Sequence, residues 1–215
     1  MNATRLARGV GSVALMVALL AAAMLVYSTH ERDYDNLYAP MSSSGAVGQT
    51  VTSGPFSVKV DKVTVAKSVS EGAYRGYGKP LTTSPSAIFV VVDARVQATT
   101  EATKLPTVYL QSGNGIHYGP SEKGSQTKFT DSIAEPGFWT VGAWLFEVPR
   151  AALPGVRLEV SPRATDDYPA PQKMFPHYGF ELMPQADVDL GISGGKATTL
   201  LAHPAVKAQY KEPEQ

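Results

Sequence analysis

Hydrophobic and polar positions divide the chain into an apolar run near the N-terminus, a polar stretch, and a long region of short alternating segments. The apolar run, Gly9–Tyr27, holds no charged residue and lies between Arg8 and His30. At about 1.5 Å per residue, a helix over these positions is roughly 28 Å long, close to the ~30 Å hydrocarbon core of a bilayer. The pattern predicts a transmembrane helix over residues 9–27.

Charged residues on either side of this run predict its orientation. Arg5 and Arg8 precede it, and a stretch of net negative charge follows it from Glu31. Basic residues are retained on the cytoplasmic side, so residues 1–8 are expected in the cytoplasm and the rest of the chain outside it, in a single-pass protein of the cell membrane. The alternative is a cleaved signal peptide with its cut at the alanines 21–23, but the apolar run continues to Tyr27, which favours an uncleaved anchor.

After a polar stretch over residues 28–47, expected to be an extracytoplasmic linker, the pattern changes to that of β-strands. A phase change at Asp61 and Lys62 predicts a β-bulge, and the glycines and asparagine of residues 112–115 predict a hairpin turn. The continuous apolar run Ile88–Val92 passes into alternation, as in a central strand that is half exposed at one end. The segments expected as strands are 56–60, 63–65, 87–97, 108–111, 116–118, 138–148 and 156–160.

Short strands, frequent turn residues and the absence of a convincing amphipathic helix predict an all-β fold, an antiparallel β-sandwich of immunoglobulin-like type over residues 48–160. Residues 161–215 are expected to be a C-terminal extension. Within it, Tyr178–Leu182 and Val188–Ile192 each have the pattern of a short strand, the second at a sheet edge. Residues from Ser193 onward are expected to be mobile, with the alternative of a helical turn or two over Thr198–Lys207.

Composition restricts the possible functions. The chain is 43% hydrophobic and 18% charged, which suits a domain with a buried core. Residues 1–27 hold two of the 19 basic residues and none of the 19 acidic residues, so the remainder has 17 basic and 19 acidic residues and a net charge of −2. This balance argues against nucleic-acid binding. The chain has no cysteine, so disulfides, thiol catalysis and lipid-modified cysteine anchors are excluded.

A family resemblance rests on the order of several motifs between residues 48 and 160. Gly48–Val51, Phe56–Val60 and Phe89–Val92 are followed by the hairpin around Gly115 and then by Pro136-Gly137 and Trp144–Pro149. This order resembles a bacterial exported immunoglobulin-like domain of unknown function, whose members are described as surface lipoproteins or immunoprotective extracellular proteins and sometimes as telomeric repeat-binding factors. The resemblance implies an extracytoplasmic sandwich and brings no catalytic residues. One departure is Ala98-Thr99-Thr100, where members commonly have asparagine.

No known catalytic or cofactor motif occurs in the sequence. The four histidines are isolated from one another, and Asp187 and Asp189, which could share a hard cation such as Ca²⁺, are better explained as a solvated strand edge. Trp139 and Trp144 are expected on opposite faces of one strand, with one of them in the core. We therefore expect no catalytic residues, no metal site and no cofactor, and we expect that the protein is not an enzyme.

The expected binding surface consists of the long loop 70–86 and the C-terminal extension, where aromatic residues lie among prolines. Its candidate residues are Tyr74, Tyr77, Tyr168, Phe175 and Tyr178. Packing over an open end of the sandwich is the simpler explanation for the aromatic residues of the extension. The expected function is non-enzymatic binding or scaffolding of an envelope or membrane protein. The alternative is an accessory binder of a small molecule or glycan for an envelope transporter or wall-assembly enzyme.

Overall fold

The computed structural model describes residues 15–27, 41–71, 80–104, 107–123, 129, 132–161 and 184–210. Residues 15–27 form a helix whose side chains are exposed, within the predicted span 9–27. In the described part of the chain, no helix has both the length and the apolar character needed to cross a membrane. The β-strands belong to a separate compact unit, described below by itself.

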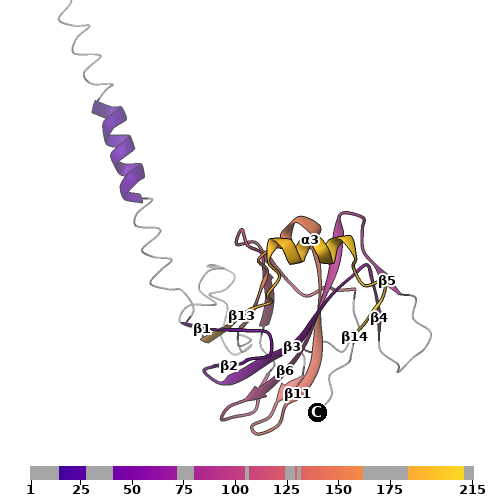
Figure 1. The fold of residues 1–215 in the computed structure, drawn as a ribbon. Helices are drawn as coiled ribbons and strands as arrows, with labels where there is room; N and C mark the ends of the chain where they lie inside the picture. Colours follow the sequence, from indigo (N-terminus) through magenta and orange to yellow (C-terminus); the bar gives the residue numbers. More distant parts are fainter. Residues whose placement is uncertain are drawn as a thin grey trace, which may run out of the picture. The chain divides into compact units, whose positions relative to one another are not determined.

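Two main sheets build the β-rich unit (Figure 1). One has the strand order β11-β6-β3-β2 and the other the order β1-β13-β12-β8-β9. Two small sheets, β14-β4-β5 and β10-β7, complete it. The strands are β1 (Met41–Ala46), β2 (Thr50–Ser53), β3 (Phe56–Ala66), β4 (Ser68–Glu71), β5 (Leu81–Thr82), β6 (Ala87–Ala98), β7 (Thr103–Lys104), β8 (Thr107–Gln111), β9 (His117–Tyr118), β10 (Ile133–Ala134), β11 (Thr140–Pro149), β12 (Arg157–Ser161), β13 (Pro184–Asp189) and β14 (Ala208–Tyr210), and a helix, α3 (Gly194–Ala202), precedes β14.

In the four-stranded sheet, β6 lies between β3 and β11 and pairs antiparallel with both. The register between β3 and β6 shifts between Val60 and Lys62, which confirms the predicted bulge. The predicted hairpin is also confirmed, because β8 and β9 pair antiparallel and Gly115 adopts a positive φ of 81°. Only glycine adopts this backbone conformation at little cost, which explains its place in the turn.

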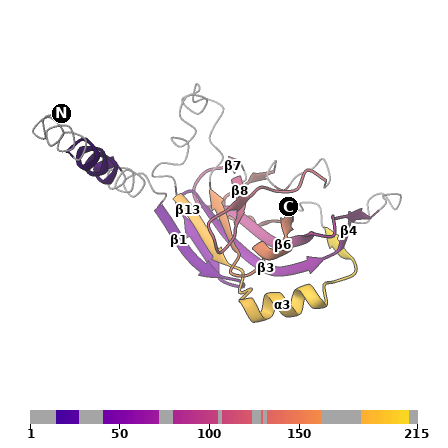
Figure 2. The same cartoon turned by 90° about the horizontal axis from the view of Figure 1, so that it is seen from above.

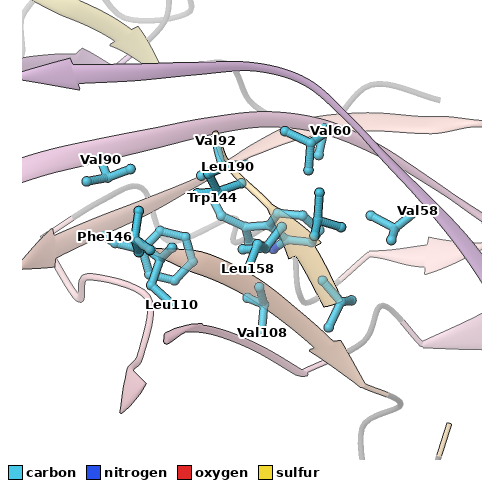
Figure 3. Close-up of a cluster of buried hydrophobic side chains, with 14 of the residues drawn as sticks. Val58, Val60, Val90, Val92, Val108, Leu110, Trp144, Phe146, Leu158 and Leu190 are labelled. Atoms are coloured by element: carbon cyan, nitrogen blue, oxygen red, sulfur yellow. The ribbon is translucent and has the colours of Figure 1, made fainter. Parts of the chain in front are cut away.

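The facing sides of the two main sheets form one hydrophobic core (Figure 3). Alternate residues of β6 and β12 point into it, so the apolar periodicity of the sequence is the periodicity of burial. Ten of its residues are labelled in Figure 3: Val58, Val60, Val90, Val92, Val108, Leu110, Trp144, Phe146, Leu158 and Leu190. The mostly β-sheet architecture is thus a β-sandwich, as predicted.

A second, smaller cluster lies on the other face of the four-stranded sheet. It contains Phe89 and Val91 of β6 and Leu145 of β11, which are at most 3% exposed, together with Ala208 of β14. This cluster explains why the run Ile88–Val92 is continuously apolar: alternate residues enter different cores. Beyond the run, Asp93 and Arg95 are only half-buried, as the change to alternation predicted.

The C-terminal segment is an integral part of the sandwich, and the expectation that residues from Ser193 are mobile is wrong for those described. Helix α3 places Ala197 in the main core, and Arg150 Nη2 donates to the carbonyl oxygen of Leu201 at 2.8 Å. The chain then crosses to β3, where Ala205 N donates to Val65 O at 2.9 Å. Finally, β14 pairs parallel with β4 beside the smaller cluster.

The expected domain boundaries also require correction. Residues 41–46, expected within the linker 28–47, form strand β1, and β13 comes from the expected extension 161–215. Strand β13 is not at a sheet edge, because it lies between β1 and β12. Strand β1 runs parallel to β13, so the sandwich is not wholly antiparallel. The expected strand 178–182 lies outside the described residues.

Candidate functional site

The outer side of the five-stranded sheet carries a group of polar side chains. Leu158 and Val160 of β12 are buried in the core, so the alternation of the strand directs Arg157 and Glu159 to the opposite side. The register between the strands brings residues of β8, β9 and β13 to the same side. We call this group the polar face: Tyr109, Gln111, His117, Arg157, Glu159 and Asp187.

An ion pair joins two neighbouring strands of the polar face. Arg157 Nε donates to Asp187 Oδ1 at 2.7 Å, and the two side chains are 34% and 20% exposed. This hydrogen bond is the main reason why the pKa of the Arg157 guanidinium is raised, and the charges of Asp187, Asp189 and Glu159 add to it. Because water screens such a partly exposed pair, its main contribution is to fix the position of the Arg157 side chain rather than to stabilise the fold.

A second pair reaches across β8. His117 Nε2 lies 2.8 Å from Glu159 Oε2, although β8 separates their strands. The Tyr109 ring meets the imidazole nearly edge-on at 6.1 Å, and Gln111 Nε2 lies 3.4 Å from the same nitrogen. Burial raises the pKa of the Glu159 carboxyl, and the charge and hydrogen bond of His117 oppose this only in part. Glu159 is therefore held in a site that penalises its charge.

The raised pKa of Glu159 predicts a pH-dependent effect of the substitution Glu159→Gln. A carboxyl whose pKa is higher in the folded than in the unfolded state favours folding when protonated, and this contribution is lost as the pH rises through the folded pKa. The variant should therefore melt a few degrees higher than the original protein at pH 8, where 1 kcal/mol corresponds to about 2–4 °C in a domain of this size. The gain should vanish at acidic pH. Melting curves across this range check the prediction, and a gain that grows with falling pH would contradict it.

The charged side chains of the polar face lie in pairs across the strands of the sheet. Arg157 forms an ion pair with Asp187, and His117 Nε2 lies within hydrogen-bond distance of the Glu159 carboxylate. Asp189 Oδ1 accepts a hydrogen bond from Gly191 N at 2.7 Å, and Asp187 Oδ1 accepts the hydrogen bond from Arg157 Nε. No group of three or more potential metal ligands occurs among the residues that the structure describes.

Three large apolar side chains are exposed within residues 133–141, and we call them the apolar patch. They are Phe138, Ile133 and Val141, which are 72%, 49% and 38% exposed. Val141 pairs in register with Arg95, whose Nε donates to Asp61 Oδ2 at 2.8 Å, so a charged pair lies beside the patch. Exposed apolar groups beside polar ones are typical of protein interfaces.

The five residues predicted to form the binding surface, Tyr74, Tyr77, Tyr168, Phe175 and Tyr178, all lie outside the described residues. Of the two tryptophans, Trp144 is buried in the core and Trp139, just before β11, is half-buried. The apolar patch was not predicted. A signal for it was present, since Phe138 directly follows the turn residues Pro136 and Gly137, where exposure is the rule.

The chain is similar to several solved structures of bacterial proteins. An uncharacterised β-sandwich protein from Clostridium difficile 630 matches with a TM-score of 0.43 and 9% identity over 70% of this chain and 95% of that one. A conserved hypothetical protein from Bacillus anthracis matches with a TM-score of 0.41 and 20% identity, over 57% of this chain and 91% of that one. The yjhA protein from Bacillus subtilis matches with a TM-score of 0.44 and 15% identity, over 67% of this chain and 99% of that one. No protein-family model matches the chain, and no curated protein matches it significantly.

Proposed function

We propose that the chain is a non-enzymatic protein of the bacterial cell envelope, anchored by residues 9–27, whose extracytoplasmic sandwich binds or scaffolds a partner protein. The apolar run Gly9–Tyr27 and its charged flanks support the anchor and the orientation. The motif order between residues 48 and 160 supports membership of the exported immunoglobulin-like family. The observation that carries the binding function is the exposure of the three large apolar side chains of the apolar patch, since exposed apolar surface marks interaction sites when it is contiguous.

The polar face favours a second candidate, an accessory binder of a small molecule or glycan. Tyr109, Gln111 and His117 place an aromatic ring beside hydrogen-bonding groups on one side of the sheet. Such combinations of apolar surface and a few oriented polar groups are common in small-ligand sites. Binding of soluble glycans that is lost in Gln111→Ala, with the apolar patch unchanged, would favour this candidate.

The anchor is tested with the full chain in its own membranes. Leu19→Arg places a charge in the middle of the apolar run, which costs about 2.5–3.5 kcal/mol at the centre of a membrane helix. The original protein should stay in the membrane pellet after alkaline carbonate washing and should be digested by protease added to intact spheroplasts. The arginine variant should be released in larger amounts. Protection of the unaltered protein from the protease would contradict the proposed orientation.

Phe138→Ser should weaken capture of the partner. The side chain is 72% exposed in the isolated chain, so its removal affects an interface rather than the core. Interface hot spots cost at least about 2 kcal/mol when truncated, which is roughly thirtyfold in affinity. In-membrane crosslinking followed by affinity capture measures the loss. The matched control is Ile116→Ser, on the β8–β9 hairpin and 50% exposed; equal capture by both variants would contradict a docking role for the patch.

A further inference from the structure

Strand β1 is an edge strand of the five-stranded sheet. It is the outermost strand of its sheet, and within the described part of the chain β13 is its only neighbour in that sheet (Figure 2). Edge strands expose free main-chain groups, and proteins usually protect them with charged residues, proline or a bulge. The sequence of β1, Met-Ser-Ser-Ser-Gly-Ala, has no charged residue and no proline, and its register with β13 is continuous over all six residues.

The hydrogen bonds at the end of β1 show which main-chain groups face outward. Val47 N donates to Asp189 O at 3.3 Å, so residues of odd number direct their main-chain groups toward β13. Ala46 N donates instead to the side-chain oxygen of Gln49 at 3.0 Å. Because N–H and C=O of one strand residue point to the same side, Ser42 and Ser44 present theirs at the outer edge.

We propose that this edge pairs antiparallel with β1 of a second copy of the chain, which joins the two five-stranded sheets into one continuous sheet. With Ser43 on the two-fold axis, Ser42 of each copy faces Ser44 of the other, and each such pair exchanges two main-chain hydrogen bonds. A pairing centred on Ser44 would instead require Ala46 N, which Gln49 already occupies. The free groups of the edge therefore select one register.

The electrostatics of the edge agree with self-pairing. β1 itself carries no charge, and the acidic side chains in register with it, Asp187 and Asp189, lie on the next strand opposite Ser44 and Ala46. In the joined sheet, the two copies of β13 are three strand spacings apart, about 14 Å. This separation exceeds the screening length of ~8 Å at physiological salt, so like charges on the two copies do not oppose the contact. The contact needs no membrane anchor, so it goes beyond the function proposed above.

The absence of cysteine from the chain allows a specific test with the full-length protein in detergent micelles. Facing residues of a non-hydrogen-bonded antiparallel pair lie about 4.5 Å apart at Cα, within the range for a disulfide. Under mild oxidation, Ser43→Cys should form a disulfide-linked dimer roughly tenfold faster than Ser84→Cys, a control in the exposed turn between β5 and β6, because paired thiols react at a high effective concentration.

Two blocking variants complete the test. Ser44→Pro, combined with Ser43→Cys, removes an outward N–H without removing a bond to β13, and should reduce the crosslinking rate to that of the control. Ser44→Lys keeps every main-chain group but places like charges across the contact, and should have the same effect. Melting curves verify that each variant is folded. Equal crosslinking of Ser43→Cys and Ser84→Cys, or crosslinking of Ser43→Cys that neither blocking substitution reduces, would overturn the proposal.

Discussion

Val188→Asp will prevent the chain from folding. Val188 is fully buried in the main core, on a strand with neighbours on both sides. An uncompensated buried charge costs several kcal/mol, which is a large part of the total stability of about 5–15 kcal/mol for a domain. The circular dichroism spectrum of the variant should therefore lose its β-sheet signal and show no cooperative melting transition.

Val206→Asp is the matched control for this experiment. It makes the same change in the same C-terminal segment at a side chain that is 83% exposed. Its melting temperature should be nearly that of the original protein, since exposed substitutions usually change stability by no more than about 0.5 kcal/mol. Normal folding of Val188→Asp would mean that the C-terminal segment lies outside the core.

Phe89→Ala will destabilise the fold by about 3–5 kcal/mol, the usual cost of truncating a buried phenylalanine. The ring is fully buried in the smaller cluster, with Lys123 Nζ 6.0 Å from its centre. This cluster lies on the face of the four-stranded sheet that the C-terminal segment covers with Ala205 and Ala208. The free energy of unfolding in urea measures the effect.

The same substitution at Phe138 provides the comparison. Phe138 is 72% exposed, so Phe138→Ala should change the free energy of unfolding by less than about 0.5 kcal/mol. If Phe89→Ala lowered the free energy of unfolding as little as Phe138→Ala, the outer face of the sheet would be open to solvent. The two variants thus test whether the C-terminal segment closes this face.

The strands with strong apolar periodicity could be predicted from the sequence. In β6 the change from a continuous apolar run to alternation correctly indicated a central strand that is half exposed at one end, because burial on one or two faces determines the pattern directly. The bulge at Asp61 and Lys62 and the turn at Gly115 could also be predicted, because each depends only on the residues that form it.

Strand β1 could not be predicted because Met41 is its only large apolar residue, which leaves the segment without an alternating apolar pattern. At Gly45 the packing requires a residue without a side chain, because a Cβ there would clash with Cγ2 of Val51. Strand β13 is internal only because β1 pairs along its other edge. Since β1 was not predicted as a strand, β13 was wrongly expected at the edge of the sheet. Helix α3 is short and buries a single residue, Ala197, which leaves little amphipathic signal.

The candidate site was predictable only in its separate parts. The alternation of residues 156–160 correctly predicted a strand, and in such a strand Arg157 and Glu159 lie on the side opposite to Leu158. The pairing of Glu159 with His117 depends on strand order, since the two residues are 42 positions apart and on strands separated by β8. Local sequence patterns carry no information on that order.

Native-state hydrogen exchange over the C-terminal segment tests most directly the claim that this segment completes the sandwich. Strand β13 pairs with β1 on one side and with β12 on the other, so its main-chain N–H groups have a neighbouring strand in either direction. We expect the amides of Pro184–Asp189, other than the proline, to exchange as slowly as those of β6, through global unfolding only. Exchange of β13 at the rate of an exposed loop, with β6 still protected, would contradict it.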